Sequence, residues 1–140
     1  MKIFKKKKII LIWDFDAPIG QVNSTFPYNF SNNNFDKEKS NIMYALNKLA
    51  EYNIKACFAI TGFSAEKGSP PFNFPEFINE ISKKGHEIAS HNWKHEWVPL
   101  FTENQIRKSF ARSKSALESS IEYRQDVVGF VPPHDKPATW

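Results

Sequence analysis

The chain is poor in cysteine, since Cys57 is the only one among its 140 residues. A lone cysteine excludes an internal disulfide framework, and nothing therefore points to an oxidising compartment. Cys57 lies inside an apolar run, so we expect it to be a buried small hydrophobic residue. Long apolar runs are also missing, because no stretch approaches the roughly 20 apolar residues that span a bilayer. We expect a cytoplasmic protein without a membrane span.

The N-terminal segment MKIFKKKK, followed by IILIW, has the layout of a signal-peptide start, but its apolar part is too short and Asp14 follows at once. Residues 1–8 hold five of the 19 basic residues, and the remaining 14 face 15 acidic residues. A nucleic-acid binder would spread its basic residues over a face. We therefore predict a solvated tail over residues 1–8, one domain over residues 9–140, and no nucleic-acid partner.

Apolar residues make up 41% of the chain and aromatic residues 15%, which is typical of a globular domain. Short apolar runs alternate with helical stripes along it. Strands are predicted at 9–13, 55–60, 86–90 and 126–131, and helices at 37–52, from Pro75 to Gly85, and from a capping box at Thr102 to about Leu117. Residues 17–35 are predicted to be a long loop. This order predicts an α/β fold with a parallel sheet and right-handed crossovers.

Polar clusters follow three of the four predicted strands. They are Asp14 with Asp16, the segment 91–95, and the segment 132–135. In parallel α/β folds the functional groups lie at the carboxyl ends of the strands. We therefore expect the three clusters to converge at one rim.

Two residues that lie two apart on a strand face the same side, so Asp14 and Asp16 can share a site. Two close carboxylates repel each other and usually have a cation nearby; alternatively, one caps the next loop and the other is solvated. His91 and His95 lie four apart, and a helical turn would bring both imidazoles to one face. Two histidines and one carboxylate are a common ligand set for catalytic zinc or non-haem iron. For His86, which lies next to the helix-ending Gly85, a structural role is favoured.

The segments DFDAPIG, GHEIASHNWKHEW and GFVPPHDKP, in this order and spacing, resemble the polysaccharide deacetylases, the NodB-homology domains of carbohydrate esterase family 4. KACFAITG is similar to the second strand of that family, and the resemblance extends over roughly residues 9–137. It implies a distorted (β/α) barrel of the TIM-barrel type. It also implies a divalent metal, most often zinc, and removal of acetyl groups from N-acetylated sugars.

By the resemblance, Asp16, His91 and His95 are the metal ligands and Asp14 is the catalytic base. The backbone N–H of His134, directly after the third-motif residue Pro133, would help to hold the oxyanion. We assign Trp93 and Pro133 to substrate binding. The rim tryptophans Trp93 and Trp97 either wall the acetyl pocket or shield the ligands from water.

The sequence departs from the family pattern at several positions. Asn92 replaces the usual Ser or Thr after the first histidine, and the first motif has the DxD form of some branches. Val131 stands where an arginine normally orients the base. The chain stops at Trp140, before the fourth and fifth motifs with the acetyl-pocket floor and the general-acid histidine. We therefore expect the N-terminal part of a longer domain, with an incomplete barrel and weak activity.

The leading hypothesis is a metal-dependent deacetylase acting on the N-acetyl or O-acetyl groups of a carbohydrate, and a cytoplasmic address would favour a small sugar over a finished polymer. Alternatives are a metal-dependent hydrolase of another non-peptide C–N amide, and a non-catalytic carbohydrate- or metal-binding remnant. Phe26, Tyr28 and Phe30 in the long loop either stack on sugar rings or cover the strand ends. The oligomeric state stays open.

Overall fold

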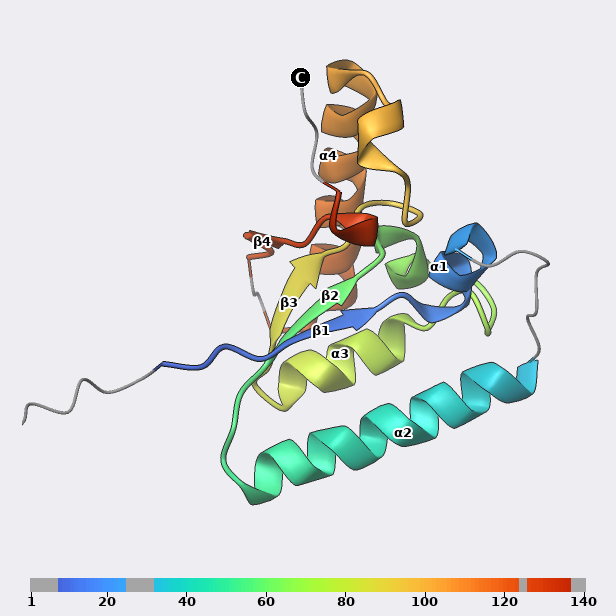
Figure 1. Cartoon of the computed structure of the whole chain (residues 1–140). Helices are drawn as coiled ribbons and strands as arrows, with labels where there is room; N and C mark the ends of the chain where they lie inside the picture. Colours follow the sequence, from blue (N-terminus) through green and yellow to red (C-terminus); the bar gives the residue numbers. More distant parts are fainter. Residues whose placement is uncertain (1–7, 25–31, 124–125, 137–140) are drawn as a thin grey trace, which may run out of the picture.

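The computed structural model describes residues 8–24, 32–123 and 126–136 of the chain (Figure 1). Most of the predicted basic tail lies outside these residues, as do Phe26, Tyr28 and Phe30. The division into a tail and one domain, and the two interpretations of these aromatic residues, therefore stay predictions.

The described residues form one four-stranded parallel sheet in the order β1-β2-β3-β4. The strands are β1 (Ile12–Phe15), β2 (Cys57–Ile60), β3 (Glu87–Ser90) and β4 (Gly129–Phe130). Phe15 lies beside Ile60, and Ile60 beside Ser90, so the carboxyl ends of the first three strands are level. This confirms the predicted parallel α/β arrangement and places the residues after each strand at one rim.

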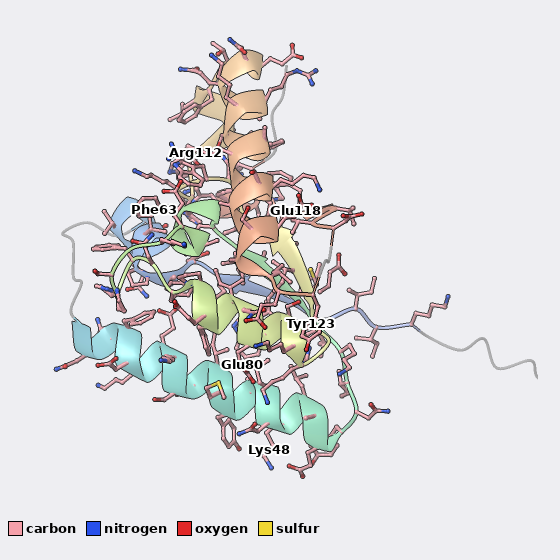
Figure 2. The ribbon with its side chains drawn as sticks, turned by 180° about the vertical axis from the view of Figure 1, so that it is seen from behind. Lys48, Phe63, Glu80, Arg112, Glu118 and Tyr123 are labelled. Carbon is pink, nitrogen blue, oxygen red and sulfur yellow. The ribbon has the colours of Figure 1, made fainter. Side chains whose placement is uncertain are left out.

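The helices are α1 (Ala17–Ser24), α2 (Asn32–Glu51), α3 (Pro75–Lys83) and α4 (Glu103–Ser120), with 3-10 turns η1 (Gly62–Ala65), η2 (Val98–Leu100) and η3 (Pro133–Asp135). In Figures 1 and 2, α3 lies between the sheet and α2, and α4 stands beside β3. The predicted capping box opens α4, since Thr102 accepts from the backbone N–H of Gln105 and donates its own to the Gln105 side chain. Within the described chain, no helix is both long and apolar enough to cross a membrane.

The predicted loop over residues 17–35 is wrong in part, because α1 occupies Ala17–Ser24 and α2 begins at Asn32. Ala17 has a φ of 53° and is fully buried, which turns the chain directly from β1 into a helix. A left-handed alanine is unusual, and the Asn-rich sequence favoured a loop. Pro18, taken as a loop residue, suits the first turn of a helix.

The first strand is shorter and more exposed than predicted. β1 begins at Ile12 rather than at Ile9, and Ile9 and Ile10 are 84% and 80% exposed, so the strand predicted at 9–13 is wrong in its bounds. β1 lies at an edge of the sheet, and an edge strand has a neighbour on one side only. Cys57 is half-buried rather than buried, and burial with the nearby Glu87 and Asp14 carboxylates raises the pKa of its thiol to about 11.

The hydrophobic core lies on the face of the sheet that is turned toward α2 and α3. Phe15 of β1 packs against Phe74 and Phe77, whose ring centroids lie 5.4 and 5.9 Å away. Leu46 of α2 is fully buried in the same cluster. Because side chains alternate along a strand, Asp14 points to the face opposite Phe15.

We expect Leu46→Ala to lower the free energy of unfolding by about 2–5 kcal/mol, because it removes a fully buried side chain and leaves a cavity. Asn47→Ala, one position along and exposed, should change it by less than about 0.5 kcal/mol. Urea unfolding of both variants measures the difference. Equal effects of the two substitutions would contradict the assignment of Leu46 to the core.

Candidate metal centre

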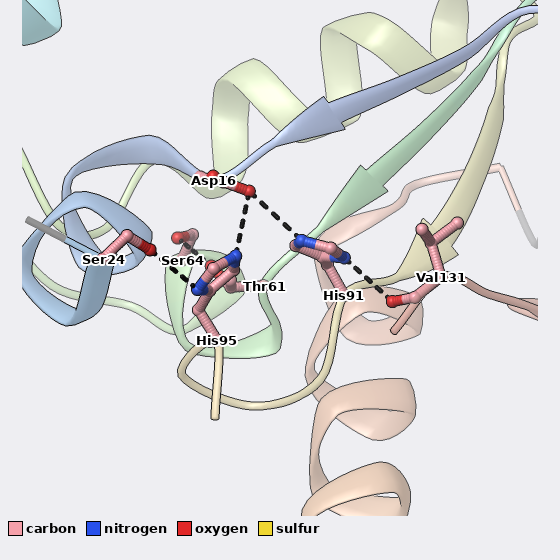
Figure 3. Close-up of polar contacts among 7 residues, drawn as sticks. All are labelled: Asp16, Ser24, Thr61, Ser64, His91, His95 and Val131. Carbon is pink, nitrogen blue, oxygen red and sulfur yellow. Dashed lines mark hydrogen bonds and ion pairs between the residues drawn. The ribbon is translucent and has the colours of Figure 1, made fainter. Parts of the chain in front are cut away.

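Asp16 and His91 follow β1 and β3, on either side of the end of β2, and His95 lies four residues further on (Figure 3). At the end of β2, the hydroxyls of Thr61 and Ser64 bond to each other at 2.7 Å. The rim of the parallel sheet therefore brings together residues that are 75 positions or more apart in the sequence, as the clustering of polar residues after the strands predicted.

The Oδ1 atom of Asp16 lies 3.1 Å from Nε2 of His91 and 3.3 Å from Nε2 of His95. One ligand atom from each residue lies within 4.8 Å of the other two. The histidines are 1% and 3% exposed, and Oδ1 is buried without a well-aligned hydrogen bond from any residue that the structure describes. Buried carboxylate oxygens are costly without a partner. Three donor atoms that crowd together without aligned hydrogen bonds are the arrangement that a shared cation satisfies, so the residues fit a divalent metal.

The rings are oriented by their second nitrogens. Nδ1 of His91 lies 2.8 Å from the carbonyl oxygen of Val131, and since a carbonyl only accepts, the proton of the neutral ring is on Nδ1. The Nε2 lone pair of His91 is thereby free toward Asp16, which is the usual arrangement of a metal-ligating histidine. Nδ1 of His95 lies 3.3 Å from the hydroxyl of Ser24. Val131 thus orients His91 through its backbone carbonyl, a contact that does not depend on the side chain at this position.

The turn that carries the histidines is not the helical turn that the spacing predicted. Asn92 and His95 have φ values of 64° and 61°, in the left-handed region. Asparagine tolerates this region better than most residues do. Asn92 is fully buried, and its side-chain and backbone oxygens accept hydrogen bonds from Ser109 and Ser113 of α4. Its departure from the family pattern therefore fits the local backbone.

Gly20 lets α1 fold back onto the first ligand. A Cβ at this position would lie 2.5 Å from the Cβ of Asp16 and 3.4 Å from Cδ2 of His95. The backbone N–H of Gly20 also donates to the Asp16 carbonyl at 3.0 Å. Only glycine permits this approach, which explains its place in the DFDAPIG segment.

The carboxylate of Asp16 and the imidazole of His91 shift each other's pKa in opposite directions. Burial would raise the pKa of Asp16, but the imidazoles of His91 and His95 outweigh it and hold the pKa well below its usual range. For His91, burial lowers the pKa, but the Asp16 carboxylate and the Val131 carbonyl outweigh it and raise the pKa. A proton and a cation therefore compete for the Nε2 lone pair of His91.

Glu38 of α2 is a feature of this region that the sequence did not reveal. Its Oε2 atom is buried and has no hydrogen-bond partner in the part of the chain that the structure describes. Burial, and then the nearby negative charge of Asp16, raise the pKa of Glu38 to about 7. In the sequence Glu38 is one polar residue among several in DKEKSN, a pattern typical of a solvated helix face.

The predicted catalytic residues lie beside the three ligands. Asp14 is exposed on β1 and is not one of the three convergent donors, although its charge contributes to raising the pKa of His91. The ring of His134 lies edge-on to His95, with centroids 4.4 Å apart. Pro133, which begins η3, is buried. The roles assigned to Asp14, His134 and Pro133 stay predictions.

Trp93 and His86 are both buried in packing positions. Trp93 is 7% exposed and packs against Phe63 and Arg112, which are labelled in Figure 2, with centroid distances of 5.7 and 3.9 Å. This contact with η1 and α4 favours a packing role, and substrate binding by Trp93 stays a prediction. His86 accepts a hydrogen bond from the backbone N–H of Ala56 at 3.2 Å, which supports the structural role favoured for it.

A family model described as polysaccharide deacetylase matches residues 5–137. A peptidoglycan-N-acetylglucosamine deacetylase of Bacillus cereus is 30% identical over 78 residues, which are 56% of this chain and 26% of that protein. Among solved structures, a Mycobacterium smegmatis protein described as a polysaccharide deacetylase has a TM-score of 0.72 and 26% identity, over 91% of this chain and 43% of its own. A carbohydrate esterase family 4 pseudoenzyme of Bacillus anthracis has a TM-score of 0.66 and 17% identity, over 96% and 38%.

The chain thus spans about a quarter of the curated relative and roughly two fifths of these two solved structures. The family model, which extends from residue 5 to residue 137, covers the segments that carry Asp16, His91 and His95.

Asp16→Asn should weaken binding of Zn²⁺ by at least about tenfold, because the neutral amide removes the one negative charge among the three donors. Asp36→Asn, an exposed acid on α2, is the matched control and should leave the affinity unchanged. Isothermal titration calorimetry of the metal-free chain measures both. Equal affinities would exclude Asp16 as a ligand.

Glu38→Gln should flatten the pH dependence of stability in the metal-free chain. A carboxyl with a raised pKa in the folded state holds a proton that the unfolded chain releases, so the free energy of unfolding falls as pH rises from about 4.5 to about 7. Glutamine cannot ionise, and its unfolding free energy should fall less over this range.

Urea unfolding at several pH values in chelator measures this slope. Deprotonation of His91 also lowers the free energy of unfolding as pH rises, and it does so in the parent and in the variant alike. The difference between the two proteins therefore isolates the contribution of Glu38. Glu51→Gln, an exposed acid on the same helix, is the control. A parallel pH profile of parent and Glu38→Gln would show that Glu38 is not protonated in the folded chain.

Proposed function

The chain belongs to the polysaccharide deacetylase family, and from this we propose that it is a metal-dependent hydrolase that removes N-acetyl or O-acetyl groups from a carbohydrate. The observation that carries the proposal is the convergence of Asp16, His91 and His95 at the carboxyl ends of β1 and β3. Two imidazoles and one carboxylate leave positions open for other ligands, as catalytic rather than structural sites do.

Asp16, His91 and His95 would hold a divalent cation, for which we propose zinc because nitrogen-rich ligand sets suit it. When bound, the cation supplies Lewis acidity that polarises an acetyl carbonyl. The Val131 carbonyl keeps the His91 ring in the orientation that exposes Nε2. Ser24 contacts the second nitrogen of His95. The chain's own residues therefore fix both imidazoles before any ligand arrives.

We propose that Asp14 takes a proton from the attacking water. It lies on β1, two residues before Asp16, it is exposed, and its negative charge contributes to raising the pKa of His91. A carboxylate within reach of a reacting water can act as a general base. The backbone N–H of His134, at the tip of η3, would donate to the oxyanion, for which preorganised donors are worth several kcal/mol, or roughly 10²–10³ in rate.

The substrate proposal follows from the curated relative. The Bacillus cereus protein is named for its action on the N-acetylglucosamine of peptidoglycan. We therefore propose an N-acetylated hexosamine as the first substrate to examine in this chain.

The alternative is a non-catalytic metal- or carbohydrate-binding protein. One observation favours it: a structurally similar protein of Bacillus anthracis is described as a pseudoenzyme. At 17% identity this likeness concerns the fold, but it indicates that the fold alone does not guarantee turnover.

We expect acetate release from N-acetylglucosamine oligomers in the presence of Zn²⁺ and none after treatment with a chelator. Asp14→Asn should lower kcat by about 10²–10⁴, the usual contribution of a general base, with Zn²⁺ affinity unchanged. Asp36→Asn is again the control for a lost surface charge. Mass spectrometry of the oligomers measures the loss of each acetyl group.

Zinc binding without any acetate release would favour the non-catalytic alternative. Acetate release that survives both the chelator and Asp16→Asn would contradict the proposed metal dependence.

A further inference from the structure

A continuous row of aromatic rings leads from the metal centre to the surface. The centroids of His91 and His95 lie 4.8 Å apart, and those of His95 and His134 lie 4.4 Å apart. The row ends at Trp97, whose ring is nearly parallel to His134, at 3.9 Å and 16°. The four rings come from the segment after β3 and from η3, so the row exists only in the folded chain.

Trp97 is 44% exposed although His134 covers one face of its indole. Its free surface is therefore the opposite face and the edge. Leu100, at the end of η2 and three residues along, is 80% exposed. An exposed tryptophan beside an exposed leucine, next to a buried polar cluster, is the kind of apolar surface that marks a ligand site.

The stack holds the indole in place. A parallel contact with His134, which itself packs edge-on against His95, restricts the rotation of the Trp97 side chain. A side chain that only shielded the ligands from water would be buried by its neighbours, as Trp93 is at 7% exposure. Trp97 instead presents a fixed, open aromatic face to solvent.

The chemistry of such a face fits a sugar ring. A pyranose has an apolar side on which several C–H bonds carry partial positive charge, and the π face of an indole is negative. Stacking of the two buries apolar surface and leaves the sugar hydroxyl groups in water. A pyranose on the open face of the indole lies at the outer end of the row of rings, with Trp97 and His134 between it and His95.

We propose that Trp97 is a carbohydrate-stacking residue that holds a pyranose ring of the substrate at the outer end of the row of rings that leads to the centre formed by Asp16, His91 and His95. The inference rests on the proposed function and adds the place where the sugar is held. Stacking on Trp97 contributes to the binding and orientation of the sugar. It requires no metal, so Trp97 should strengthen oligosaccharide binding in the metal-free chain as well.

The test uses the metal-free chain and a tetramer of N-acetylglucosamine, with binding measured by calorimetry. Trp97→Ala should weaken binding by about five- to tenfold, the usual range for a lost aromatic contact. Trp97→Phe, which keeps a ring against His134, should recover most of this loss. Tyr52→Ala removes an aromatic residue that is 67% exposed at the other end of the fold and should change nothing.

Two further readouts separate a positioning role from a structural one. The affinity for Zn²⁺ should be the same in Trp97→Ala as in the parent, and acetate release should show a raised KM with little change in kcat. In a ¹H–¹⁵N spectrum of the parent, the indole N–H of Trp97 should shift on addition of the tetramer, which decides the matter even if Trp97→Ala does not fold.

The outcomes distinguish the two proposals. If the parent binds the tetramer but Trp97→Ala binds it equally well and the indole signal does not move, the stacking role is overturned and the proposed function stands. If the parent neither binds nor deacetylates the tetramer, the carbohydrate function and the stacking role both fall.

Discussion

The buried Oδ1 atom of the half-buried Asp16 carboxylate, facing two nearly inaccessible imidazoles, is the constraint around which the rim is built. A carboxylate oxygen that is removed from water needs a compensating charge or aligned donors, and Oδ1 has the His91 and His95 nitrogens at 3.1 and 3.3 Å without a well-aligned hydrogen bond. Burial, and then the same negative charge, raise the pKa of Glu38 to about 7. A divalent cation would relieve both carboxylates at once.

The rest of the rim is arranged to keep those donors in place. The Val131 carbonyl fixes the tautomer of His91, and Asn92 supplies a left-handed turn that is tied to α4 by two serines. Gly20 allows α1 to close over Asp16. Each of these contacts uses backbone geometry or a small side chain. The backbone conformation, more than charged neighbouring side chains, therefore holds the three donors in place.

The row of rings formed by His95, His134 and Trp97 connects the centre to the surface. η3 carries His134 against His95, and Trp97 covers His134 from the outside. A buried polar cluster thereby borders an exposed aromatic face, the combination that a carbohydrate ligand with both hydroxyl groups and apolar C–H surfaces requires. The family match and this geometry both support the proposed carbohydrate substrate.

The alternation of strands and helices and the parallel sheet could be predicted from the sequence, because apolar periodicity and the position of polar residues after strands are local properties. The same pattern pointed to His91 and His95 together with a carboxylate, but the choice of Asp16 over Asp14 came from the resemblance to the family. The sequence pattern misplaced the start of the first strand and missed α1, since edge exposure and a left-handed Ala17 depend on neighbours. Three features became visible only in the folded chain: the His91–His95 turn is not helical, Glu38 lies near Asp16, and Trp93 is buried while Trp97 is open. These features arise from contacts between segments far apart in the chain, which no local pattern encodes.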